Sequence, residues 1–120
     1  MDALERSLLW LGIEDYTGLW QAVAEARGDR EPRTAHDALV RARRTIESLL
    51  AADFVELFRC PEPLANETVE RVPAEEQPGI LGANGSWAVP EEGGVSVRYA
   101  TTDRGFAVYQ KEVGWWLSLK

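Results

Sequence analysis

The residues of this chain with the chemistry of a nucleophile and a base are Cys60, its single cysteine, and His36, its single histidine. A cysteine or serine nucleophile needs a neighbouring general base, and hydrolases often hold it in a sharp glycine-bounded turn. No such turn surrounds Cys60 or any serine. His36 stands near Thr34 at a predicted helix start, where we expect an exposed first-turn residue. The sequence therefore predicts no nucleophilic catalysis.

Two pairs of adjacent acids, Glu75-Glu76 and Glu91-Glu92, are the candidates for metal binding or acid–base chemistry. Adjacent acids in a segment rich in proline and glycine are usually solvated, and glycoside hydrolysis also needs a sugar cleft between two carboxyl groups. A lone cysteine excludes a structural thiolate metal site, and no phosphate loop or dinucleotide fingerprint is present. We expect a protein that is not an enzyme and holds neither a cofactor nor a metal.

Charge is unevenly distributed along the chain, which carries −7 in total. Residues 27–44 hold six arginines against three acids, whereas residues 45–96 hold ten acids against Arg59 and Arg71. An acidic protein of this kind is repelled by nucleic acid as a whole and attracted to a basic partner.

The basic segment contains Arg41, Arg43 and Arg44 on one predicted helix. They are the candidate nucleic-acid-binding residues, because arginine binds phosphate and guanine. The competing interpretation is a solvated helix face on which they pair with Asp37 and Glu47 at helical spacing. We favour this second interpretation, because the rest of the chain is acidic.

Hydrophobic spacing indicates three helices in the first half of the chain. The first covers residues 4–11 and ends at Gly12, and the second runs from an Asp15 N-cap to about Arg27, before Gly28. The third follows a Thr34 N-cap and is the strongest signal, with apolar residues at helical spacing. These are Ala35, Ala38, Leu39, Ala42, Ile46, Leu49 and Leu50. Asp53 should end this helix, since aspartate tolerates a left-handed backbone.

Two strands, Phe54–Arg59 and Val95–Ala100, are predicted to pair with each other. Between them, residues 62–94 are predicted to be an irregular acidic insert with a short helix near 74–81, an Asn84-Gly85 turn and a Trp87 anchor. Thr102 should cap a helix to about Glu112, and the alternation over 113–119 suggests an edge strand. The predicted fold is a single α+β domain, mainly helical, over residues 1–120.

Two segments resemble the winged-helix (winged helix-turn-helix) superfamily of bacterial regulators. The run Thr45-Ile46-Glu47-Ser48-Leu49-Leu50-Ala51-Ala52-Asp53 followed by 54–59 is similar to a recognition helix and first wing strand. The run Val97-Arg98-Tyr99-Ala100-Thr101-Thr102-Asp103-Arg104-Gly105 is similar to the second wing strand and following helix. The resemblance implies a three-helix core with a small antiparallel sheet, and it places Arg41, Arg43 and Arg44 on the DNA-contacting helix. The segment that joins the strands is longer than an ordinary wing and is acidic.

Two functions follow as expectations. The first is a non-enzymatic protein-interaction module, of the kind that neutralises a toxin as an immunity protein or antitoxin, and its partner is a basic protein. Its contact residues would be Glu62, Glu67, Glu70, Glu75, Glu76, Glu91, Glu92 and Trp116. The alternative is a small DNA-binding transcriptional regulator that uses the three arginines. We prefer the first, because one positively charged segment supplies few phosphate contacts.

The five tryptophans carry further expectations. Trp10 and Trp20 fall on apolar helix faces and should lie in the core. Trp115 and Trp116 are adjacent, so on a strand they point to opposite sides and only one can face the core. The other suits a homodimer contact along an edge strand. No apolar run is long enough to cross a membrane, and a single cysteine is typical of a cytoplasmic protein.

Overall fold

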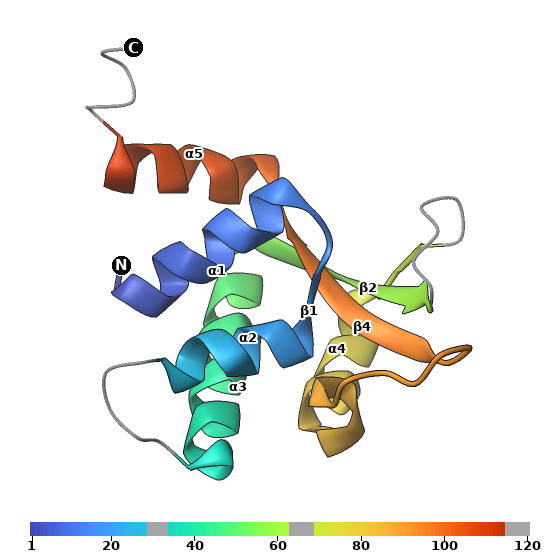
Figure 1. Cartoon of the computed structure of the whole chain (residues 1–120). Coiled ribbons are helices and arrows are strands. Elements are labelled where there is room, and N and C mark those ends of the chain that lie inside the picture. The colour runs from blue at the N-terminus through green and yellow to red at the C-terminus, as the bar shows by residue number, and fades with distance from the viewer. Residues whose placement is uncertain (29–33, 63–68, 115–120) are drawn as a thin grey trace.

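The computed structural model describes residues 1–28, 34–62 and 69–114. It is an α+β fold, 60% helical, with five α-helices and a four-stranded antiparallel sheet in the described part. Helices α1 (Ala3–Glu14), α2 (Leu19–Arg27) and α3 (Ala35–Ala51) precede the main hairpin of β2 (Val55–Pro61) and β4 (Val95–Thr101). Helix α5 (Asp103–Val113) follows and lies along α1 (Figure 1).

The first two helices are placed differently from the sequence prediction. Helix α1 continues through Gly12 to Glu14. Gly12 lies against β4, where a Cβ would meet Thr101 Oγ1 at 2.6 Å. Asp15 ends α1 and does not cap α2, whose N-cap is Gly18. The residues between them form β1 (Thr17–Gly18), which pairs with β4. Glycine was thus needed here for a close approach and not for a helix stop.

Helix α3 confirms the strongest prediction. The Thr34 hydroxyl accepts a hydrogen bond from the Asp37 N–H at 3.0 Å, which satisfies one of the free donors of the first turn. Ala38, Ala42, Ile46 and Leu49 are buried along one face, whereas Ala35 at the very start is exposed. Asp53 has a φ of 61°, so it does adopt the left-handed backbone that ends the helix.

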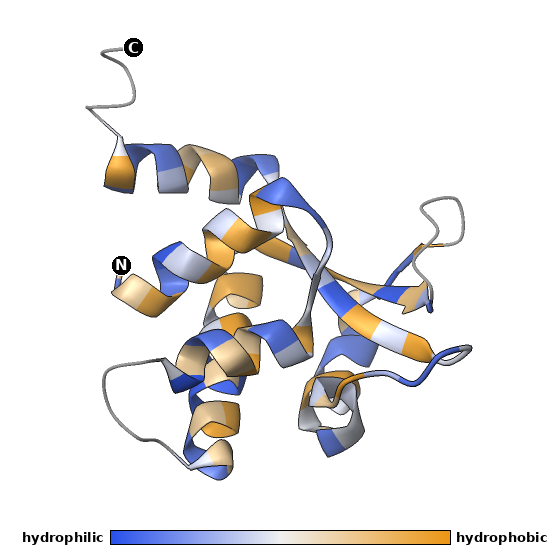
Figure 2. Ribbon diagram, in the orientation of Figure 1, coloured by the Kyte–Doolittle hydropathy of each residue, from blue (hydrophilic) through white to orange (hydrophobic). Residues whose placement is uncertain are grey.

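The sheet has the order β1-β4-β2-β3, with every pair antiparallel. The predicted pairing of β2 with β4 is confirmed, in a register that sets Leu57 opposite Tyr99. Both of these side chains are fully buried, and the Tyr99 hydroxyl donates to the Leu8 carbonyl oxygen at 2.7 Å. Figure 2 shows hydrophobic residues interleaved with hydrophilic ones along each helix, as expected of elements with one face on the core.

Two tryptophans predicted to be in the core are not. Trp10 is 48% exposed and stacks on Tyr109 of α5, with ring centroids 5.8 Å apart. Trp20 is half-buried, and the centre of its ring lies 4.9 Å from Cζ of the Arg98 guanidinium. Both rings therefore cover a neighbouring element at the edge of the core. The edge strand predicted over residues 113–119 lies largely outside the described residues, and Val113 itself belongs to α5.

Candidate functional site

Residues 69–94 form an ordered unit and not the irregular insert that composition predicts. Strand β3 (Glu70–Arg71) pairs with β2, and the 3₁₀ turn η2 (Ala74–Glu76) leads into α4 (Gln77–Gly82) and η3 (Asn84–Trp87). The short helix near 74–81 and the Trp87 anchor are confirmed. The Trp87 side chain is 5% exposed, and its indole N–H donates to the Leu81 carbonyl oxygen at 3.0 Å.

The insert displays most of its predicted contact acids. Within the described residues, Glu70, Glu75, Glu76, Glu91 and Glu92 are all exposed. Glu76 Oε1 accepts a hydrogen bond from Arg59 Nη2 at 2.7 Å, and the other four form no ion pair in the described part of the chain. Two further predicted contact residues, Glu67 and Trp116, lie outside the described residues.

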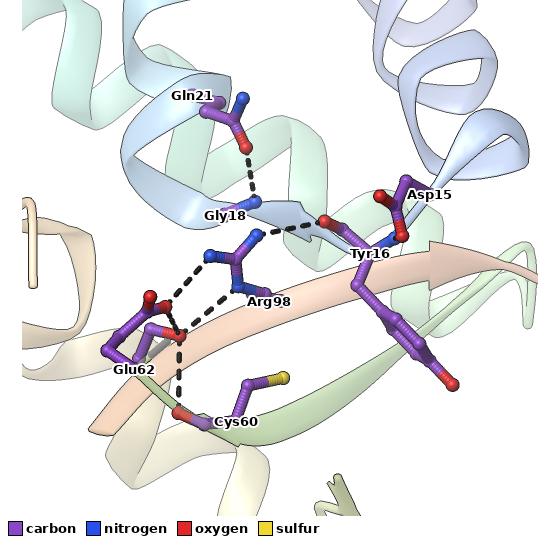
Figure 3. Close-up of polar contacts among 8 residues, drawn as sticks. Asp15, Tyr16, Gly18, Gln21, Cys60, Glu62 and Arg98 are labelled. Atoms are coloured by element: carbon purple, nitrogen blue, oxygen red, sulfur yellow. Dashed lines mark hydrogen bonds and ion pairs between the residues drawn. The ribbon is translucent and has the colours of Figure 1, made fainter. Parts of the chain in front are cut away.

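Glu62 differs from the other predicted contact acids, because it belongs to a half-buried polar cluster at the far end of the hairpin. Its Oε1 accepts from Arg98 Nη2 at 2.8 Å and from the Ser96 hydroxyl at 2.7 Å. Arg98 also donates to the Tyr16 carbonyl oxygen at 3.1 Å (Figure 3). Arg98 therefore links the hairpin to the segment before α2, and its ion pair with Glu62 removes that acid from the exposed acidic surface.

The sequence did carry a signal for this cluster. Arg98 is the one charged residue in β4, and a charge within a packed strand is normally paired. Its partner could not be identified, because 36 residues separate the two side chains. Beside the cluster, burial raises the pKa of the Cys60 thiol, so this buried cysteine remains protonated at neutral pH.

We predict that Glu62→Gln lowers the unfolding free energy by about 2 kcal/mol at neutral pH, since the Arg98 guanidinium would lose its carboxylate inside the fold. The hydrogen bond from Arg98 holds the pKa of Glu62 below its ordinary value of 4.5. The stabilisation is therefore complete above pH 4.5 and is lost as the pH falls through the lowered folded-state pKa.

Urea unfolding of both proteins across the acidic range measures this difference. Glu76→Gln is the matched control, because its partner Arg59 is exposed and such pairs contribute less than about 1 kcal/mol. If the Glu62→Gln difference were equally small, or independent of pH below 4.5, the stabilising role of the pair would be disproved.

The structure separates the three candidate arginines of α3. Arg43 faces the insert, where its Nη2 donates to Asn84 Oδ1 at 3.2 Å and its guanidinium lies 6.0 Å from the centre of the Trp87 ring. Arg41 and Arg44 line a polar hollow together with His36, Asp37 and, from the N-terminus, Asp2. The predicted cluster of three is therefore a pair, and two aspartates share its hollow. His36 is exposed in the first turn, as expected.

A second hollow lies between α3 and α4 and has a volume of about 540 Å³. Most of its lining is apolar. The hollow could not be predicted from the sequence, because its two walls come from segments that meet only in the fold. The apolar lining residues are Leu50, Ala51, Ala74, Pro78, Leu81 and Gly82.

The described residues contain no group of His, Cys, Asp or Glu side chains arranged to hold a metal ion. Across residues 1–28, 34–62 and 69–114, no helix has both the length and the apolar character needed to cross a bilayer. Comparison of the chain with protein-family models, with curated proteins and with solved structures finds no match.

Proposed function

We propose that this chain is a non-enzymatic protein-binding module, of the type that neutralises a toxin as an immunity protein or antitoxin, with a basic protein as its partner. One observation carries the proposal. The acidic insert is folded against the body of the molecule and exposes Glu70, Glu75, Glu91 and Glu92, which form no ion pair within the described residues. The insert also exposes Arg71, which pairs with Glu56, so acids predominate on this surface. A fixed surface on which one charge sign predominates steers and orients an oppositely charged partner.

The winged-helix arrangement belongs to the same proposal. It is supported by the order helix, short strand, two helices and hairpin, and by the strand order β1-β4-β2. In such an arrangement α3 corresponds to the recognition helix, and the insert takes the position of the wing. The proposed module therefore keeps the frame of a DNA-binding domain and replaces its DNA-facing wing with an acidic surface.

DNA binding is the second candidate, and one observation favours it. Arg41 and Arg44 lie side by side on α3 and form no ion pair within the described residues. Two arginines supply few phosphate contacts, however, and Asp2 and Asp37 line the same hollow. The electrostatic balance therefore favours the protein partner.

A salt series with random-sequence duplex DNA, followed by fluorescence anisotropy, separates the two functions. We expect no micromolar, salt-sensitive binding, because non-specific affinity comes from phosphate contacts. The Arg41→Glu/Arg44→Glu variant tests the helix, and Arg104→Glu/Lys111→Glu on α5 is the control with the same change of charge. DNA binding that the first variant abolishes and the second retains would overturn the proposed function.

A second experiment tests the protein partner directly. The candidate is the protein encoded by the gene next to the one for this chain. Calorimetric binding that weakens when Glu70, Glu75, Glu91 and Glu92 are changed together to glutamine supports the proposal.

The proposal also includes a cytoplasmic location, supported by the single cysteine. It includes self-association as well, supported by the exposed Trp10 and Phe106 on α1 and α5.

A further inference from the structure

The hollow between α3 and α4, called the groove from here on, has the properties of a pocket that binds a side chain. Its volume of about 540 Å³ lies within the range of known binding pockets. One wall is the C-terminal half of α3, with the half-buried Leu50, and the other is α4, with Leu81 and Pro78. The hollow therefore offers a concave, apolar surface into which an apolar side chain of a partner could insert.

The rim of this groove is negative for two separate reasons. The last turn of α3 ends at Ala51 in the groove and carries no basic side chain, so no side-chain cation offsets the partial negative charge of the helix end. Glu47 stands one turn earlier on the same wall and is exposed. Glu75 follows Ala74, which lines the opposite wall. A cation beside the groove would be stabilised by the helix end and by Glu47, and Glu75 stands next in sequence to the opposite wall.

Arg43 is the one cation among the groove's lining residues, and it does not neutralise Glu47. The two residues are four positions apart on α3, a spacing at which their side chains can reach each other. No ion pair joins them in this structure, because the Arg43 side chain instead contacts Asn84 and the Trp87 ring. The fold therefore holds the arginine on the insert and leaves the Glu47 carboxylate available to a partner.

We infer that this groove binds an amphipathic, basic helical segment of the protein partner. Its apolar side chains would enter the groove over Leu50 and Leu81, in the way amphipathic helices dock in hydrophobic grooves. Arginines or lysines flanking them would pair with Glu47 and Glu75. This inference rests on the proposed function and deepens it, because it assigns the partner both a basic and an apolar component.

The probe is a synthetic fluorescein-labelled peptide with leucines at helical spacing and arginines on both flanks. A scrambled peptide of the same composition keeps the charge and removes the apolar face. Binding to the full chain is measured by anisotropy, and ¹H–¹⁵N NMR shifts locate it. We expect the ordered peptide to bind about tenfold more tightly than the scrambled one, with the largest shifts at Leu50, Ala51 and Leu81.

Two glycines of α4 provide a matched pair of variants. Gly82 lines the groove and Gly79 does not, and at neither position would an added Cβ meet an atom within 4 Å. Gly82→Arg places bulk and positive charge in the groove, so it should weaken peptide binding about tenfold or more. Gly79→Arg has the same charge and should bind like the wild type. Circular dichroism and urea unfolding verify that both variants fold.

Every outcome of this experiment is decisive. Equal binding of the two peptides, or equal loss in the two arginine variants, would show attraction to the acidic surface alone and would overturn the groove while leaving the proposed function intact. No binding of the ordered peptide overturns the groove as well. Failure of the proposed function is detected separately by DNA binding through Arg41 and Arg44.

Discussion

Gly105→Ala is expected to lower the unfolding free energy by about 3 kcal/mol, because the first turn of α5 has no space for a side chain. A Cβ at this position would overlap the carbonyl oxygen of Phe54 and would lie 2.9 Å from the Thr101 methyl carbon. The first obstacle is backbone, so rotation of a side chain cannot relieve it. Gly105 is also the one fully enclosed residue of α5 in the described part.

The effect should be large because the affected carbonyl belongs to a junction of two turns. The Phe54 carbonyl oxygen accepts from the Thr102 N–H at 3.0 Å, and the Thr102 hydroxyl donates to the Asp53 carbonyl oxygen at 2.7 Å. The same hydroxyl oxygen accepts from the Gly105 N–H at 3.0 Å. Displacing Phe54 would therefore weaken the end of α3 and the start of α5 together.

Urea unfolding monitored by circular dichroism measures this loss, and Gly79→Ala is the control. The added methyl group at Gly79 meets no atom within 4 Å, and alanine is the better helix former, so that variant should equal or exceed the wild type by up to about 1 kcal/mol. A Gly105→Ala protein as stable as the control would mean that the helix does not approach the sheet so closely.

The elements that the sequence predicts correctly are those specified by neighbouring residues. The Thr34 cap and the apolar face of α3 lie within one helix, and Thr102 and Gly105 lie within one turn. Strand β1 cannot be predicted from the sequence, because its two residues have no periodicity of their own and become a strand only by pairing with β4. The sequence indicates a helix stop at Gly12 for the same reason, since the role of this glycine depends on Thr101, far along the chain.

The candidate site divides in the same way. Composition alone predicts that an insert rich in glutamate is exposed, and five of its acids are. The exception is Glu62, whose environment is set by Arg98, 36 residues away. Helical spacing groups Arg43 with Arg41 and Arg44, because it describes the contacts within one helix only. Its contact with Asn84, 41 residues away, exists only once the insert has folded.

Trp87→Ala is the variant that connects the fold of the insert to function, and it should cost about 3–5 kcal/mol of unfolding free energy. The indole is almost completely buried, and its loss removes both that packing and the hydrogen bond to Leu81. Amide hydrogen exchange should rise most in residues 74–87, since they depend on this anchor. Trp10→Ala is the control, because its ring is 48% exposed and should cost much less.

The same variant discriminates between the two functions of α3. Freeing Arg43 from Trp87 and Asn84 would add a third arginine to the helix, so a DNA-binding protein that the insert restrains should bind duplex DNA more tightly after Trp87→Ala. For a protein-binding module, the variant should remain unable to bind DNA and should lose the peptide, because the α4 wall of the groove is no longer held.

Trp87→Phe keeps most of the packing without the indole N–H, and it should retain the groove if Trp87→Ala proves too unstable to measure. Tighter DNA binding in either variant would shift the assignment of α3 to nucleic acid, whereas loss of the peptide alone would place the function in the acidic insert and its groove.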